Sequence, residues 1–74
     1  MKKFKYKDIF KAKSELLGKT VHFTSDCMIF PNFDVTGKVV DITLYEQRLL
    51  IHILKNGKRY RIDSNMYNLQ FEVL

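Results

Sequence analysis

The 74-residue sequence contains no tryptophan, one cysteine, one proline and three glycines. The single cysteine, Cys27, excludes an internal disulfide framework and favours a reducing, cytoplasmic setting. No apolar run approaches the ~20 residues that span a bilayer, so we expect no membrane partner. The basic N-terminus lacks the apolar segment and cleavage site of a secretory signal. A length of 74 residues with a hydrophobic content of 46% predicts one small globular domain, residues 1–74.

Patterns typical of catalytic and metal sites are also missing. The glycines form no Gly-x-Gly arrangement of the kind that cradles phosphates. His22, Asp26 and Cys27 lie close in sequence, but a structural zinc site needs four ligands and a fourth is absent nearby. We interpret Cys27 as a small buried hydrophobic residue. We therefore expect no catalytic residues, no metal and no cofactor, and the sequence predicts that the protein is not an enzyme.

Positive charge is concentrated at the N-terminal end. Residues 1–19 contain seven lysines and two acidic residues, a net charge of +5, and the remaining residues are balanced. Such an asymmetry attracts nucleic acid, anionic lipid or an acidic protein. Alternatively, these lysines only keep a surface helix soluble.

Residues 5–17 have the spacing of an amphipathic helix. Gly18 follows at a position where helices readily end. Lys3, Lys7 and Lys11 recur at four-residue intervals and would form a basic edge beside the apolar side of that helix. The expected apolar side consists of Tyr6, Ile9, Phe10, Leu16 and Leu17.

From residue 19 onward, apolar residues recur at every second position, which is the period of a β-strand. A slip in this alternation predicts a bulge near Val40, and Gly37 would permit a bend in the same strand. A short helical turn is expected over 64–69. The predicted strand regions are 20–24, 34–46, the hairpin of 48–63, and 70–74.

The Asn56–Gly57 pair is a strong hairpin signal, because both residues tolerate the positive φ angles of a type I′ turn. A two-residue turn here sets Lys55 opposite Lys58 and His52 opposite Arg61. The predicted core face carries Leu49, Ile51, Ile53, Tyr60 and Ile62. The opposite face, called here the outer hairpin face, carries Leu50, His52, Leu54, Arg59, Arg61 and Asp63. We expect the N-terminal helix to cover this outer face; otherwise it is a site for a partner.

The order of these elements is similar to that of SH3-like small barrels. Residues 61–67, Arg-Ile-Asp-Ser-Asn-Met-Tyr, resemble the Ile-Pro-Ser-Asn-Tyr segment that precedes the last strand of many SH3 domains. The resemblance implies a mainly β fold: a five-stranded SH3-like barrel over 19–74 with one N-terminal helix. Ser64, Asn65 and Tyr67 carry over from the family's peptide groove, but the chain has no tryptophan and has Asp63 in place of proline. An Sm-like barrel is the alternative fold, although its Arg-Gly signature is missing.

Two groups of residues are candidates for binding. Basic residues suited to phosphates form the first, and apolar residues of the 27–33 loop form the second. The alternative for the loop is that it packs into the barrel. The nucleic-acid candidates are Lys3, Lys7, Lys11, Lys55, Lys58, Arg59 and Arg61, and the protein-docking candidates are Met28, Phe30 and Phe33.

The predicted function is a small binding module that contacts nucleic acid or a ribonucleoprotein through its basic residues. The alternative is a protein-binding adaptor, or a small inhibitor of a larger enzyme, that docks through the 27–33 loop. Small lysine- and isoleucine-rich domains of this kind resemble products of phages or mobile elements. The sequence leaves the partner's identity and the oligomeric state open.

Overall fold

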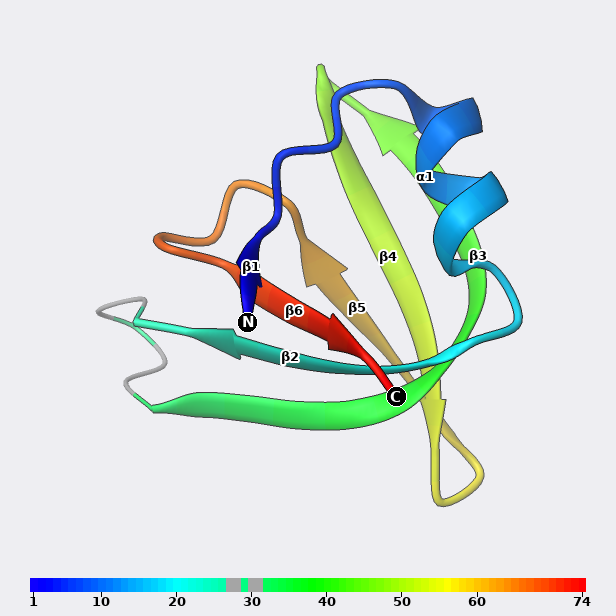
Figure 1. Ribbon diagram of the computed structural model, residues 1–74, viewed down its shortest axis with the longest axis vertical. Coiled ribbons are helices and arrows are strands. Elements are labelled where there is room, and N and C mark those ends of the chain that lie inside the picture. The colour runs from blue at the N-terminus through cyan, green and yellow to red at the C-terminus, as the bar shows by residue number, and fades with distance from the viewer. Residues whose placement is uncertain (27–28, 30–31) are drawn as a thin grey trace.

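The computed structural model describes residues 1–26, 29 and 32–74. The described residues form one helix and six strands: β1 (Lys2–Lys3), α1 (Ile9–Leu16), β2 (Thr20–Ser25), β3 (Phe33–Tyr45), β4 (Arg48–Lys55), β5 (Lys58–Asp63) and β6 (Gln70–Val73). All strand pairs are antiparallel and belong to one sheet of order β1-β6-β2-β3-β4-β5 (Figure 1). The mainly β fold with one helix is confirmed. The sheet has six strands rather than five, and it is not closed into a barrel, because β1 and β5 form its two edges.

The long strand β3 joins the two halves of the sheet. Its first part pairs with β2 and its second part pairs with β4. The register shifts between Val39 and Asp41, so the predicted bulge is confirmed. Gly37 is buried at the crossing between the two halves, where a Cβ atom would lie 2.8 Å from the backbone oxygen of Leu54. Only glycine therefore lets the strands approach this closely.

The β4–β5 hairpin has the predicted register, with Lys55 opposite Lys58 and His52 opposite Arg61. Asn56 and Gly57 have φ angles of 52° and 78°, as a type I′ turn requires. The predicted core face is buried except for Tyr60, which is 45% exposed. Tyr60 lies on the edge strand close to the turn, beyond the packed interior.

The interior is one cluster of side chains drawn from the helix, the N-terminal segment and both halves of the sheet. Burying such a cluster is the main favourable contribution to folding in a chain of this size. Its members are Phe4, Ala12, Leu16, Val21, Phe23, Val39, Ile42, Leu49, Ile51, Ile53, Ile62, Leu69 and Phe71.

The helix is shorter than residues 5–17, because Asp8 caps its N-terminus. Asp8 has an extended backbone, and its Oδ1 accepts a hydrogen bond of 2.8 Å from the backbone N–H of Phe10. Residues 4–7 belong to no helix or strand, and β1 before them pairs with β6. The apolar side of the helix is also narrower than predicted: Ala12 and Leu16 are buried, whereas Phe10 is 79% exposed. The helix ends near Gly18, whose φ is 81°.

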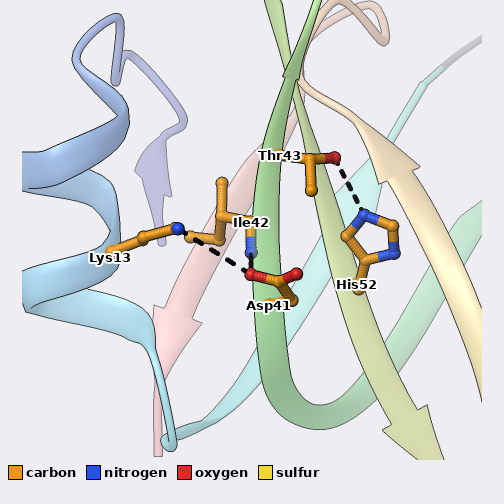
Figure 2. A network of polar contacts seen from close by, with 5 residues as sticks. All are labelled: Lys13, Asp41, Ile42, Thr43 and His52. Atoms are coloured by element: carbon orange, nitrogen blue, oxygen red, sulfur yellow. Dashed lines mark hydrogen bonds and ion pairs between the residues drawn. The ribbon is translucent and has the colours of Figure 1, made fainter.

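The helix does not cover the outer hairpin face, so that prediction is wrong. Its buried residues, Ala12 and Leu16, join the same core as the inner face of the hairpin. Lys13 reaches Asp41 of β3, with Nζ 3.9 Å from Oδ1. Figure 2 shows the helix on one side of β3 and His52 on the other. A helix that must bury its apolar side packs on the core, which leaves the outer face without cover from the helix: Leu54, Arg59 and Arg61 are exposed, and Leu50, His52 and Asp63 are half-buried.

Candidate functional site

Five lysines of the N-terminal part line one surface depression, together with Tyr6, Asp8, Glu15 and Phe71. These lysines are all exposed, and among the described residues none of them forms an ion pair. We call this site the lysine depression; its lysines are Lys2, Lys3, Lys5, Lys7 and Lys11.

The two acidic residues of the depression are already occupied by interactions within the chain. The hydroxyl of Tyr6 donates a hydrogen bond of 2.5 Å to Glu15 Oε1, and Asp8 caps the helix. Partial burial, and then the neighbouring Glu15 carboxylate, raise the pKa of Tyr6 to about 12. Five lysines against two carboxylates still leave the lining with a net positive charge, so the potential at this site is positive.

Aromatic packing fixes the segment that carries the lysines. The rings of Phe4 and Tyr6 meet edge to face with centroids 5.2 Å apart, and both rings also contact Phe71 of β6. The backbone N–H of Phe4 donates a hydrogen bond of 2.8 Å to the carbonyl of Leu69. The segment is therefore anchored beside β6 before it crosses from β1 to α1 (Figure 1). Less backbone entropy is lost on binding when the charged residues are held in this way.

Lys3, Lys7 and Lys11 do line one surface, but they do not lie along one helix. Lys3 belongs to β1, Lys7 to the connection between β1 and α1, and Lys11 to α1. Sequence reasoning missed Lys2 and Lys5, because a helical spacing of four residues does not select them. Phe4 and Tyr6 alternate with Lys3, Lys5 and Lys7, and this period of two is the sequence signal that argued against a helix over these residues.

The second basic cluster lies elsewhere on the molecule. Lys55, Lys58 and Arg59 are exposed around the hairpin turn, which projects from the sheet in Figure 1. Arg61 is also exposed and lines a different depression, together with Arg48 and three further residues. None of the N-terminal lysines lines that depression. The two basic clusters are therefore separate features.

The 27–33 loop is only partly described. Met28 and Phe30 lie outside the described residues. Phe33 is half-buried and packs against the core, as the alternative interpretation of the loop expected. Ile29 is 79% exposed.

Within residues 61–67, Asp63, Ser64 and Asn65 form hydrogen bonds that stabilise the fold. Ser64 exchanges two hydrogen bonds of 2.9 Å with the backbone of Leu49, one through its N–H and one through its hydroxyl oxygen. Asp63 Oδ1 accepts a hydrogen bond of 2.8 Å from the N–H of Asn65, which stabilises the turn where the family has proline. Tyr67 is 73% exposed.

His22 and Asp26, which lie near each other in sequence, have separate partners. His22 Nε2 lies 2.6 Å from Asp34 Oδ1, and Asp26 accepts a hydrogen bond of 2.8 Å from Asn68. Cys27 lies outside the described residues. Within the described part of the chain, no group of three or more His, Cys, Asp or Glu side chains is arranged to hold a metal ion.

No family model matches this chain, and comparisons with curated proteins and with solved structures found no match. No helix among the described residues is long and apolar enough to cross a membrane.

Proposed function

We propose that the protein is a nonenzymatic module that binds the phosphate backbone of a nucleic acid in the lysine depression. The observation that carries this proposal is the convergence of five exposed lysines, without ion pairs among the described residues, on one surface. Lysine ammonium groups attract phosphates as point charges, and binding releases counterions from the nucleic acid. Contacts of this kind are indifferent to base sequence.

We also propose that the fold is SH3-like. The strands β2 to β6 follow the helix in the expected order, with a long connection after β2, a tight hairpin between β4 and β5, and a turn before β6. The pairing of β2 with β6 supports this proposal, because it joins the first and last of those five strands.

The test is the salt dependence of binding to short single-stranded and duplex oligonucleotides, followed by fluorescence anisotropy. The affinity of the unaltered protein should fall steeply between about 50 and about 200 mM NaCl. The triple variant Lys3→Ala, Lys7→Ala, Lys11→Ala should bind more weakly. The slope of log Kd against log salt should also decrease by about one for each lost phosphate contact.

A second triple variant, Lys55→Ala, Lys58→Ala, Arg59→Ala, is the matched control, because it removes the same charge from the hairpin. We expect a much smaller loss of affinity from this control. Absence of binding at about 50 mM salt would refute the proposal. Equal losses in the two triple variants would show that net charge, and not the lysine depression, attracts the nucleic acid.

A protein-docking role for the 27–33 loop is the second candidate. The exposure of Ile29 favours it, since apolar side chains form the buried centre of protein interfaces. In this alternative the protein is an adaptor or a small inhibitor of a larger enzyme. An Ile29→Asp variant that lost a protein captured from the native cell, with an unchanged far-UV spectrum, would support it.

A further inference from the structure

Strand β5 forms a long edge of the sheet, whereas the other edge, β1, has only two residues. Among the described residues, β4 is the only strand paired with β5. An edge strand presents unpaired backbone groups to which another chain can add. The question is which kind of chain this edge fits.

The hydrogen bond of 2.9 Å from the N–H of Ser64 to the carbonyl of Leu49 determines which backbone groups of β5 face β4. In an antiparallel pair, the backbone N–H and C=O groups of every second residue bond to the partner strand. The backbone groups of the residues between them point away from that strand. Because Ser64 bonds to the β4 side, every second residue before it does so too, and the even-numbered residues of β5 that bond to β4 are Lys58, Tyr60 and Ile62. The backbone N–H and C=O groups of Arg59 and Arg61 therefore point outward from the edge.

The side chains of Arg59 and Arg61 leave positive charge on this edge without compensation from nearby acids. Asp63 forms an ion pair with Arg48, with Oδ2 3.0 Å from Nε, and Asp41 pairs with Lys13. Neither arginine forms an ion pair within the described chain. An acidic partner would complement these charges.

Apolar surface accompanies the charge. Leu54, opposite Arg59, is 42% exposed, and Tyr60 is 45% exposed. Leu50 lines the depression that also contains Arg61. His52 shares a hydrogen bond of 2.9 Å with Thr43 and forms part of the same outer face (Figure 2). Charged side chains alone are enough to prevent unwanted strand pairing at an edge. Exposed apolar side chains beside them are instead typical of an edge that binds a partner, because they pack against it.

A second copy of this chain is a poor occupant. An antiparallel pair of two β5 strands would bring the basic side chains at 58, 59 and 61 of one copy close to those of the other. Like charges across a strand pair are destabilising. The strand that fits must come from a different, acidic chain.

We propose that the free edge of β5 binds an extended, acidic segment of another protein as an additional antiparallel strand. The backbone of that segment bonds to the outward N–H and C=O groups of Arg59 and Arg61. Its carboxylates lie beside the two guanidinium groups, and its intervening apolar residues pack near Tyr60. This inference is independent of the lysine depression.

The experiment uses the full chain, labelled with ¹⁵N, and a short peptide in which glutamate alternates with valine. We expect the amide protons of Arg59 and Arg61 to gain about tenfold or more protection from hydrogen exchange when the peptide is added. The even-numbered amides of β5 are already bonded to β4 and should change little. A peptide with lysine in place of glutamate should not bind.

Two charge-reversal variants separate this site from the lysine depression. Arg59→Glu/Arg61→Glu should lose about tenfold or more in affinity for the glutamate peptide and gain affinity for the lysine peptide. Lys5→Glu/Lys7→Glu changes the net charge by the same amount and should leave binding of the glutamate peptide within about twofold. Far-UV spectra of both variants check their folding, and the exchange measurement on the unaltered chain does not depend on either.

Several results would overturn the proposal. These are no binding of the glutamate peptide at millimolar concentration, equal losses in the two variants, or protection confined to the lysine depression. Protection of the Arg59 and Arg61 amides by an oligonucleotide, or by formation of a dimer in the absence of peptide, would assign the edge to a different partner.

Discussion

Tyr6 contributes both to the packing of the N-terminal segment, through its ring, and to the charged surface of that segment, through its hydroxyl. Its ring packs with Phe4 and Phe71, while its hydroxyl bonds to Glu15 at 2.5 Å. The same contact holds the Glu15 carboxylate beside Tyr6 at the lysine depression and ties the N-terminal segment to α1. Burial, together with the Glu15 carboxylate, raises the pKa of Tyr6 to about 12 from an ordinary value of 10.0.

This raised pKa predicts a loss of stability at high pH. Because the folded-state pKa exceeds the unfolded-state value, the contribution of Tyr6 is fully present below pH 10 and is lost as the pH rises towards 12. The Tyr6→Phe variant cannot ionise at this position. Its free energy of unfolding should therefore fall less steeply than that of the unaltered protein between pH 10 and 12, as measured by urea denaturation. Parallel curves would contradict a role for the Tyr6–Glu15 contact in pH-dependent stability.

At the scale of elements, the two tight hairpins, β3–β4 and β4–β5, both have two-residue turns in which each residue has a positive φ angle. Asn56 and Gly57 are well suited to positive φ. Glu46 and Gln47, which join β3 to β4, also have positive φ angles of 48° and 66°. Neither of these residues adopts that conformation easily, so the β3–β4 turn is strained.

Replacing the strained pair should stabilise the protein. The double variant Glu46→Asn/Gln47→Gly should raise the free energy of unfolding by about 1 kcal/mol, because the new residues fit positive φ. In a domain of this size, that gain corresponds to a rise in Tm of about 4–8 °C. The reciprocal exchange, Asn56→Glu/Gly57→Gln, should lower Tm by a similar amount. Thermal denaturation followed by circular dichroism measures both; no difference between the two turns would argue against strain as the cause.

For the whole molecule, local patterns predicted the sheet better than they predicted where the helix packs. The hairpin register and the bulge near Val40 followed from residue period and turn chemistry, which act over a few residues. The number of strands did not, because β1 (Lys2–Lys3) forms only by pairing with distant β6. No local pattern in two lysines predicts a strand.

The candidate sites show the same limit. Helical spacing selected Lys3, Lys7 and Lys11, but only Lys11 lies on the helix, because Lys2–Lys3 form a strand and α1 begins at Ile9 after its cap Asp8. The outer hairpin face followed correctly from the register, but its exposure depended on the packing of α1. A sheet has two faces on which a helix can pack. Which of them the helix covers is determined by the packing of the whole core and not by the sequence of either element alone.

The uneven charge of the whole molecule predicts how its stability responds to salt. The net charge is +5, and five exposed lysines of the lysine depression share one surface, so they repel one another in the folded state. Raising NaCl from about 0.01 to about 0.15 M shortens the Debye length from about 30 to about 8 Å and screens this repulsion. The free energy of unfolding should therefore increase by about 1 kcal/mol or less over that range, and Tm should rise by a few degrees. The Lys3→Gln/Lys7→Gln/Lys11→Gln variant should show a shallower rise and a higher Tm at the lowest salt. A Tm that falls with salt in the unaltered protein would mean that attractive ion pairs outweigh the repulsion among these lysines.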